Sequence, residues 1–249
     1  MWFFAAAVCL ATLQVEGRPD PLTVSAAISL TDALEAAARA FVAAGGHPVR
    51  FNFGGSNTLA RQIVSGAPVD VYISADEMQM DVVARAGAID PASRVDLVGN
   101  RLAIMTRAGL APVSDPHALA RPEIRRIAVG DPAAVPAGVY ARKFLQAAGL
   151  WERLQPKTVP VSNVRAALAA VENGSVDAAI VYESDTIVAT GAVATAIVSG
   201  PAAPRIVYPA AIVTGSRNRA QAERFLSFLR GPEAAAIFKR YRFIPLIGR

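Results

Sequence analysis

Four turns along the chain have the composition of an anion-binding site. Each follows a short apolar run and leads into a helix-like segment, and each offers hydroxyl groups, glycines or free backbone N–H groups. The first turn of a helix carries unpaired N–H groups and a partial positive charge, so it attracts anions. In open α/β sheets, ligands bind beyond the carboxyl ends of the strands, where such turns meet. The turns are Ser25–Asp32, Phe53–Arg61, Gly130–Tyr140 and Val161–Arg165.

Two serines supply hydroxyl groups in the first two turns. Ser29 has Asp32 three residues later, a spacing that predicts a capping-box-like helix start. Ser56 follows Gly54-Gly55, whose missing side chains let the backbone approach a ligand. A serine at a helix start is also a common structural cap without any ligand. The second turn fits neither nucleotide-binding pattern, because no Lys-Ser/Thr pair follows and the glycine spacing differs from G-x-G-x-x-G.

Two backbone donors and one phenol complete the candidate set. In the third turn a proline suits the first helical position, so the next residue, Ala137, presents a free N–H. In the fourth turn Ser162 or Asn163 is expected to cap a helix, which leaves the Val164 N–H free. Tyr182 ends a strand-like apolar run, where its hydroxyl can reach a ligand at the same sheet edge. The alternative for Tyr182 is an aromatic ring that packs at the strand end.

The elements that must position these groups alternate between strands and helices. Apolar residues recur at helical spacing from Leu30 to Phe41 and again from Val164 to Val171. This alternation predicts mostly parallel sheets with helices on both faces, and the number of runs favours two sheets. Two helices, Arg217–Leu229 and Pro232–Tyr241, are expected to end the chain. The strand-like runs are Leu22–Ala27, Val49–Phe53, Val69–Ile73, Leu102–Thr106, Ile124–Val129, Thr158–Val161, Val176–Val181 and Ile206–Val213.

Composition excludes several classes of protein. The 249 residues are 53% apolar and 18% charged, which is too apolar for a disordered chain. One cysteine, Cys9, excludes a disulfide framework and a cysteine-based zinc site, and two histidines leave little for other metals. The formal net charge is +5, but the arginines are dispersed rather than clustered with aromatic residues. We therefore expect no nucleic-acid partner.

The N-terminus is typical of an export signal. The run Trp2–Leu13 has the length of the apolar part of a signal peptide, and a small-x-small pattern ends at Gly17. Residues 1–17 are therefore predicted to be a signal peptide, although the usual basic start is missing. The alternatives are a short strand or helix of the fold, or a lipid attached at Cys9, whose flanking residues are a poor match to a lipobox. The remaining chain would then lack cysteine, which suits an oxidising compartment.

Six segments occur in an order that is typical of one family. They read SAAISLTDAL, FNFGGSNTLARQIVSGAPVDVYISAD, LVGN, IAVGDPAAVPAGVYA, VRAALAAVENGSVDAAIVYESD and GPEAAAIFKRYRF. The segments GAPVDVYISAD and VGDPxxVPAGxYA are the most specific. Together they resemble the periplasmic molybdate-binding proteins of ABC-type importers, over Leu22 to Phe243.

The resemblance implies a type II periplasmic-binding fold, of the α/β class. Two α/β lobes would be joined by two hinge strands, with the ligand cleft between them. Lobe one would comprise residues 22–102 plus 210–249, and lobe two residues 103–209. The crossings between the lobes would fall near Asn100–Met105 and Tyr208–Val213, so the two terminal helices return to lobe one.

The resemblance also implies the ligand and its partners. One tetrahedral oxyanion, molybdate and also tungstate, would bind with high affinity to the hydroxyls of Ser29, Ser56 and Tyr182 and the backbone N–H groups of Ala137 and Val164. The protein would act as a monomer that delivers the oxyanion to the membrane permease of an ABC importer. The resemblance implies no cofactor, no catalytic residue and no direct ligand of a metal cation.

Two departures from the family pattern lie beside these residues. Ile28 precedes Ser29 where alanine is commoner, so we expect it to narrow the mouth of the cleft or to pack inward. Gly54-Gly55 replaces a turn richer in serine, which preserves backbone donation and adds flexibility.

Three other functions stay open from the sequence. The first is binding of another tetrahedral oxyanion such as sulfate. The second is an enzyme on the same fold, although neither serine has a histidine in a convincing motif. Glu183 and Asp185, after the Tyr182 strand, could form an acid/base pair, but Ser-Asp after a strand is also a cap. The third is a cytoplasmic effector-binding domain, which the N-terminal apolar run disfavours.

Overall fold

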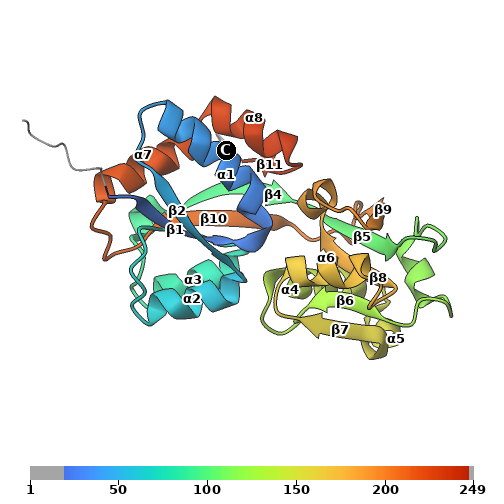
Figure 1. Cartoon of the computed structure of the whole chain (residues 1–249). Coiled ribbons are helices and arrows are strands. Elements are labelled where there is room, and N and C mark those ends of the chain that lie inside the picture. Colours follow the sequence, from blue (N-terminus) through green and yellow to red (C-terminus); the bar gives the residue numbers. More distant parts are fainter. Residues whose placement is uncertain (1–19, 247–249) are drawn as a thin grey trace, which may run out of the picture.

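Two β-sheets, each with its own helices, make up the molecule (Figure 1). The computed structural model describes residues 20–246. The predicted signal peptide, residues 1–17, and Cys9 lie outside these residues. Each sheet with its helices forms one lobe, which confirms the expected α/β class and its two-lobed architecture. We call them the six-stranded lobe and the five-stranded lobe.

The six-stranded lobe is built from both ends of the described chain. Helices α1, α7 and α8 cover one face of its sheet, and α2 and α3 cover the other (Figure 1). Its helices are α1 (Thr31–Ala43), α2 (Ser56–Val64), α3 (Glu77–Arg85), α7 (Arg219–Leu229) and α8 (Pro232–Arg240). In spatial order its strands are β11 (Ile244–Pro245), β4 (Val95–Asn100), β10 (Ile206–Ile212), β3 (Val71–Ile73), β1 (Leu22–Ala27) and β2 (Val49–Gly54).

The five-stranded lobe is formed by the middle of the chain. Helices α4 and α6 pack on β6 and β8 at the centre of its sheet. Its helices are α4 (Pro136–Ala147), α5 (Trp151–Leu154) and α6 (Val164–Glu172). In spatial order its strands are β7 (Thr158–Val161), β6 (Ile127–Gly130), β8 (Ala178–Tyr182), β5 (Leu102–Arg107) and β9 (Ala192–Ile197).

Neither sheet is mostly parallel, and that prediction was wrong. Strand β1 is parallel to β2 and β3, and β6 is parallel to β7 and β8. Strand β10 is antiparallel to β3 and β4, and β5 is antiparallel to β8 and β9. The reason is the exchange of chain between lobes. The chain enters β5 and β10 from the other lobe, so both strands start at the cleft and run away from it. The strands beside them run toward the cleft.

The two crossings lie side by side. The first passes through Arg101, between β4 and β5, and the second joins the end of β9 to the start of β10. Ile206 already pairs with Asn100 in the six-stranded sheet, and the Val198 N–H donates to the Leu102 carbonyl at 2.8 Å. The second crossing therefore precedes Ile206. The resemblance had implied a later position, near Tyr208–Val213.

The helical periodicities are confirmed as buried faces. In α1 the buried side chains are those of Ala33, Leu34, Ala37, Ala38 and Phe41, and in α6 they are those of Val164, Ala167, Leu168 and Val171. Within residues 20–246 no helix is long and apolar enough to cross a membrane. The same residues contain no group of three or more His, Cys, Asp or Glu side chains that could hold a metal ion.

Candidate functional site: a cavity between the two lobes

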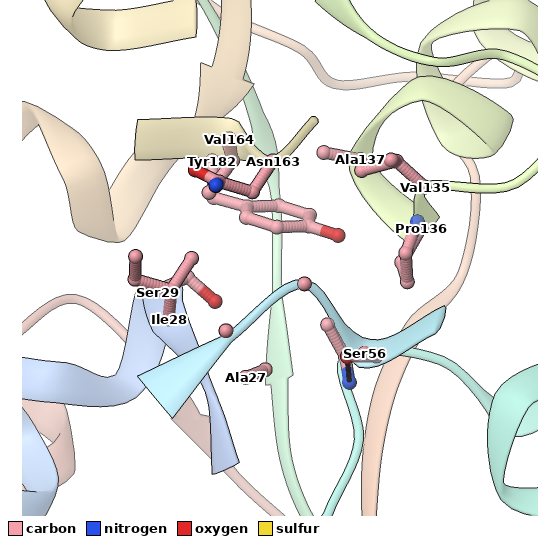
Figure 2. A pocket seen from close by; sticks show the side chains of 13 residues that line it. Ala27, Ile28, Ser29, Ser56, Val135, Pro136, Ala137, Asn163, Val164 and Tyr182 are labelled. Atoms are coloured by element: carbon pink, nitrogen blue, oxygen red, sulfur yellow. Dashed lines mark hydrogen bonds between the residues drawn. The ribbon is translucent and has the colours of Figure 1, made fainter. Parts of the chain in front are cut away.

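All five predicted ligand residues line one cavity between the lobes (Figure 2). None of the residues that line the cavity has a charged side chain. Each of the five is at most 3% exposed. Its lining is Ala27, Ile28, Ser29, Gly54, Gly55, Ser56, Ala75, Val135, Pro136, Ala137, Asn163, Val164 and Tyr182.

Ser29 comes from the turn between β1 and α1, but it is not a helix cap. It lies in a short 3-10 turn, Ile28–Leu30, and no side chain caps that turn or α1. The Ser29 hydroxyl instead lies 3.0 Å from the Tyr208 hydroxyl. The predicted capping box is therefore wrong, because a 3-10 turn precedes the helix and Asp32 belongs to the first turn of α1. Ile28 is half-buried against the core and also lines the cavity.

Ser56 is the first residue of α2, and the backbone around it fixes its hydroxyl. The Ala75 N–H donates to Ser56 Oγ at 2.9 Å. A hydroxyl oxygen that accepts this bond still has its own proton to donate toward the cavity. Ala75 follows the end of β3, a fifth turn at the same sheet edge that the sequence reasoning passed over although it lies in the motif YISAD.

Gly55 lies where the backbones of the two lobes approach each other closely. A Cβ atom at residue 55 would lie 3.0 Å from the carbonyl oxygen of Ser162, which belongs to the five-stranded lobe. Contacts this short are tighter than ordinary packing, so a side chain here would push the two lobes apart. The absence of a side chain lets the backbone of the second turn meet that of the fourth.

Two helices of the five-stranded lobe direct their N-termini at the cavity. Pro136 is the first residue of α4, as predicted, and Ala137 follows it. Asn163 caps α6 by accepting a hydrogen bond from the Ala166 N–H at 3.0 Å, which leaves Val164 as the first helical residue. First-turn N–H groups have no acceptor within their own helix. Both helices therefore present backbone donors and the positive end of a helix dipole to the cavity.

Gly138 explains why α4 can lie so close to the sheet. A Cβ atom at residue 138 would collide with the carbonyl group of Gly130, at the end of β6. The Pro-Ala-Gly sequence therefore combines a helix start, a free N–H and a close helix–strand contact. The motif predicts the helix start, whereas the contact with β6 depends on the tertiary fold and has no local sequence signal.

Tyr182 has a buried hydroxyl without a hydrogen-bond partner among the described residues. The side chain ends β8, is 1% exposed, and points into the cavity (Figure 2). Burial raises the pKa of Tyr182 well above its ordinary value, so the phenol keeps its proton. An unpaired buried hydroxyl costs free energy unless a ligand accepts its hydrogen bond. Tyr182 is therefore a donor that the protein alone leaves unsatisfied.

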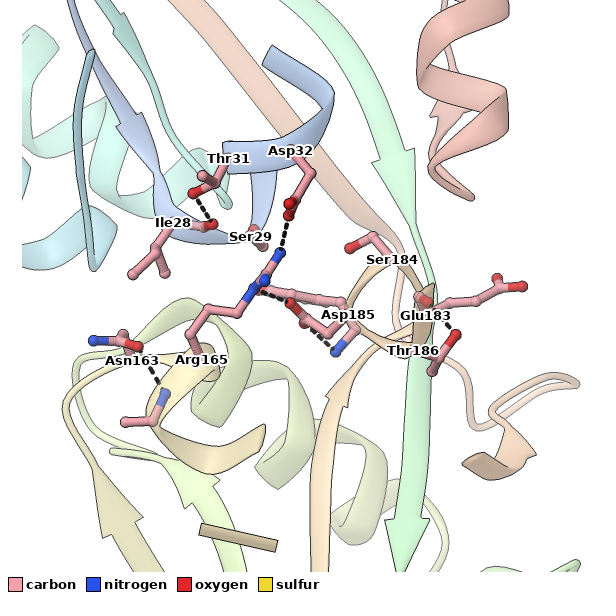
Figure 3. A network of polar contacts seen from close by, with 12 residues as sticks. Ile28, Ser29, Thr31, Asp32, Asn163, Arg165, Glu183, Ser184, Asp185 and Thr186 are labelled. Carbon is pink, nitrogen blue, oxygen red and sulfur yellow. Dashed lines mark hydrogen bonds and ion pairs between the residues drawn. The ribbon is translucent and has the colours of Figure 1, made fainter. Parts of the chain in front are cut away.

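One arginine, which the sequence reasoning missed, links the lobes beside the cavity (Figure 3). Arg165 follows Val164 in α6, and its Nη2 donates to Asp32 Oδ2 of α1 at 2.7 Å. Its Nε lies 2.8 Å from Asp185 Oδ1. The other carboxylate oxygen of Asp185 accepts from the Tyr182 N–H at 3.1 Å. This network ties the Val164 and Tyr182 segments to each other and to the turn that carries Ser29.

The carboxylates near the cavity are engaged in structure rather than arranged for acid/base chemistry. Burial raises the pKa of Asp185 to about 6, even though Arg165 lowers it. Glu183 accepts two hydrogen bonds from Arg101, at 2.6 and 3.0 Å. The half-buried His47 and the exposed His117 do not line the cavity. No histidine is therefore in place to activate either serine, and Glu183 and Asp185 do not face a common reacting atom.

The arrangement is suited to a small, fully deprotonated oxyanion. Hydroxyl and N–H groups from both lobes surround an uncharged, buried space, and such donors hold anions without a counter-charge. The cavity offers donors and no carboxylate, so a protonated anion would leave its own hydroxyl facing another donor.

The chain is similar in sequence to molybdate-binding proteins. The protein named molybdate-binding protein ModA in Escherichia coli (strain K12) is 41% identical over 227 residues, which are 89% of this chain and 88% of that protein. The protein of the same name in Haemophilus influenzae is 32% identical over 227 residues, 89% of each. Both similarities extend over nearly the whole described region.

Solved structures share the architecture. The periplasmic molybdate-binding protein of Azotobacter vinelandii has a TM-score of 0.82 at 29% identity, over 90% of this chain and 98% of that chain. The sulfate-binding protein SubI of Mycobacterium tuberculosis has a TM-score of 0.80 over 91% of this chain and 87% of that chain, but at 20% identity it shares the fold alone. Residues 22–244 match the family of bacterial extracellular solute-binding proteins. The chain belongs to this family.

Proposed function

We propose that this protein binds molybdate with high affinity and delivers it to an ABC importer. The observation that carries the proposal is the convergence of five uncharged donor positions on one buried cavity. The 41% identity to a molybdate-binding protein over nearly the whole chain favours molybdate over sulfate. We assign the ligand contacts to the hydroxyls of Ser29, Ser56 and Tyr182 and the N–H groups of Ala137 and Val164.

Binding would depend on neutral donors in a dry site. Hydrogen bonds to a charged group contribute about 1.5–3 kcal/mol each. Five of them support a binding free energy of roughly −8 kcal/mol or stronger, after the costs of ordering and desolvation, which corresponds to a submicromolar Kd. Molybdate and tungstate are nearly equal in size, so we expect tungstate to bind too, whereas sulfate is smaller and leaves the donors out of reach.

The two lobes would close over the ligand by a hinge motion. The first proposed lobe comprises residues 22–102 and the C-terminal segment. The second comprises the residues between them, which start at 103. We propose that the second boundary lies before Ile206 rather than at 209/210, since the start of β10 in the six-stranded sheet supports that position. The two adjacent crossings would act as the hinge, because hinges are formed by a few loop or strand-end residues that absorb the change in backbone angles. Closure would exclude water, which strengthens every hydrogen bond to the anion.

The remaining parts of the proposal concern the cell. We propose that the protein works as a monomer in the periplasm, after export by the signal peptide at residues 1–17. Its partner would be the membrane permease of a molybdate importer. Membership of a solute-binding family supports a binding role rather than an enzymatic one.

Calorimetric titration with three oxyanions tests the proposal. Protein freed of bound ligand is titrated with molybdate, tungstate and sulfate under identical conditions. We expect submicromolar binding of molybdate and tungstate, and sulfate weaker by about tenfold or more, which corresponds to about 1.4 kcal/mol. Sulfate binding as tight as molybdate, or no heat with any of the three anions, would refute the proposed function.

A further inference from the structure

We infer that Tyr208 and Asn100, two residues outside the cavity lining, fix the direction in which the Ser29 hydroxyl donates. The two side chains form a chain of hydrogen bonds that runs from the crossing between the lobes to Ser29. In this arrangement Tyr208 is a positioning residue, and it acts on the ligand only through Ser29. The inference rests on the proposed function, because it assigns a role to Ser29 toward the oxyanion.

The amide of Asn100 has a defined orientation. The Arg101 N–H donates to Asn100 Oδ1 at 2.8 Å, so this atom is the carbonyl oxygen. The other atom, Nδ2, carries two protons and no lone pair, so it acts only as a donor. It donates to the Ser184 hydroxyl at 3.0 Å and to the Tyr208 hydroxyl at 3.4 Å. The Tyr208 oxygen is therefore an acceptor toward Asn100.

The proton of Tyr208 then has one acceptor among the described residues. Asn100 Nδ2 cannot accept it, and the Ser29 oxygen lies 3.0 Å away. Tyr208 is fully buried, and burial raises its pKa above the ordinary value, so the phenol keeps this proton. Because Ser29 Oγ accepts from Tyr208, its own proton is free to point into the cavity.

Ser56 shows the same arrangement with a backbone donor. There the Ala75 N–H donates to the serine oxygen at 2.9 Å, which leaves the serine proton for the cavity. Each of the two serine oxygens thus accepts one hydrogen bond from a protein group, while its own proton is free to point into the cavity. A pre-oriented donor needs less reorganisation when an anion binds than a hydroxyl that must rotate.

Packing holds the Tyr208 ring in place. Its ring lies edge-on to Tyr182 at 5.8 Å and to Phe243 at 5.6 Å between centroids. Asn100 ends β4, just before the first crossing, and Tyr208 lies near the start of β10, just after the second. Asn100 also holds Ser184, which follows β8 in the five-stranded lobe. The direction of the Ser29 proton is therefore tied to the same segment that joins the lobes.

A double-mutant cycle tests the inference. The full chain, freed of ligand, is titrated with sodium molybdate as wild type, Tyr208→Phe, Ser29→Ala and the double variant. We expect Tyr208→Phe to weaken binding about tenfold, since Ser29 loses its fixed donor direction. In the Ser29→Ala background the same change is expected to have no further effect beyond about twofold, because Tyr208 acts through Ser29.

Two further variants keep the test independent of folding defects. Tyr241→Phe removes a phenol hydroxyl at the end of α8 and is expected to bind like wild type, with thermal unfolding measured for every variant. Asn100→Asp puts an acceptor where Nδ2 donates, so Tyr208 can turn its proton away from Ser29. We expect it to weaken binding more in the wild-type background than in the Ser29→Ala background, where only the repulsion between its carboxylate and the anion remains.

Each outcome separates the inference from the proposed function. Wild-type affinity in Tyr208→Phe together with weak binding in Ser29→Ala would refute the inference alone. Equal losses from Tyr208→Phe with and without Ser29 would also refute it, because that result indicates a general packing role. Failure of the wild type to bind molybdate, or wild-type affinity in Ser29→Ala, would overturn the proposed site and the inference with it.

Discussion

At the scale of single residues, the site depends on groups that other parts of the protein already orient by hydrogen bonds. Ser56 accepts from Ala75, and Asp185 holds the backbone N–H of Tyr182. The Tyr182 hydroxyl is the exception, since it is buried without a partner among the described residues. The proposed ligand donors carry no charge, so the net charge of +5 does not describe the site. The relevant quantity is the number of donors that converge on one buried space.

Removing a donor should weaken binding without unfolding the protein. Ser56→Ala and Tyr182→Phe are each expected to cost about 1–3 kcal/mol of molybdate binding, because each removes a donor to a buried charge. Ser227→Ala, an exposed serine on α7, is the matched control. Titration calorimetry provides the affinities. Wild-type affinity in both site variants would show that the cavity is not the molybdate site.

Asp185 should give the stability a measurable pH dependence. Burial raises its pKa from 3.8 to about 6, so the folded protein binds a proton that the unfolded chain releases. The stabilisation from this proton is complete below the unfolded pKa and is lost as the pH rises through about 6. We expect the free energy of unfolding of wild type relative to Asp185→Asn to fall by on the order of 1–3 kcal/mol between pH 4 and 7.

Urea unfolding of ligand-free protein at four pH values measures this difference. Asp185→Asn is the reference for wild type, because its amide does not titrate and the two proteins share every other titratable group. A difference that stays constant between pH 4 and 7, or that grows with pH, would contradict the raised pKa of Asp185.

At the scale of elements, close contacts between backbones place the helix N-termini. Gly138 lets α4 approach the end of β6, and Gly55 lets the α2 turn approach Ser162. Gly138→Ala should lower the free energy of unfolding by about 1–3 kcal/mol, the usual cost of overpacking, and displace the Ala137 N–H. Gly215→Ala, where a Cβ atom meets nothing within 4 Å, is the control. Chemical denaturation and molybdate titration check both effects, and equal behaviour of the two variants would contradict this account of α4.

Much of the element order follows from local pattern, because buried helix faces and strand ends are visible in the sequence. The stripe in α1, the Pro136 start of α4 and the Tyr182 end of β8 were predicted correctly. Strand β4 was missed because Asp96, Gly99 and Asn100 interrupt its apolar pattern. Strand β9 was missed because it is half exposed at a sheet edge and rich in alanine.

Contacts that depend on the tertiary fold have no local signal. The five positions around the cavity came from turn chemistry and a family resemblance, and the structure brings them to one place. Arg165, Asp32 and Tyr208 could not be found in this way. Asp32 and Arg165 are separated by 133 residues, and Ser29 and Tyr208 by 179. Only the exchange of chain between two lobes makes these residues neighbours.

At the scale of the whole molecule, the cavity exists only where the two lobes meet. The ion pair between Asp32 of α1 and Arg165 of α6 bridges them, with side chains 38% and 22% exposed. Gln79 Nε2 also donates across the cleft to the Ala134 carbonyl, at 3.3 Å. Under the proposed hinge motion, contacts of this kind stabilise the closed arrangement.

Loss of the bridging ion pair should therefore weaken ligand binding. Asp32→Asn is expected to reduce molybdate affinity by about 0.5–1 kcal/mol, the range of a partly exposed ion pair. Glu223→Gln, which breaks the exposed pair with Arg219 on α7, should leave the affinity unchanged. The effect of Asp32→Asn should shrink at high salt, because salt screens the pair. Titrations at low and high salt check this, and equal affinity of the two variants would argue against a closing role.

The central claim is that one tetrahedral molybdate is held by neutral donors from both lobes. A crystal structure of the protein with molybdate, with anomalous diffraction recorded at the molybdenum edge, tests it most directly. We predict one molybdenum peak in the cavity, with oxygens about 2.7–3.2 Å from the donor atoms of Ser29, Ser56, Ala137, Val164 and Tyr182. A peak elsewhere, or a molybdate paired with an arginine or lysine, would contradict the account.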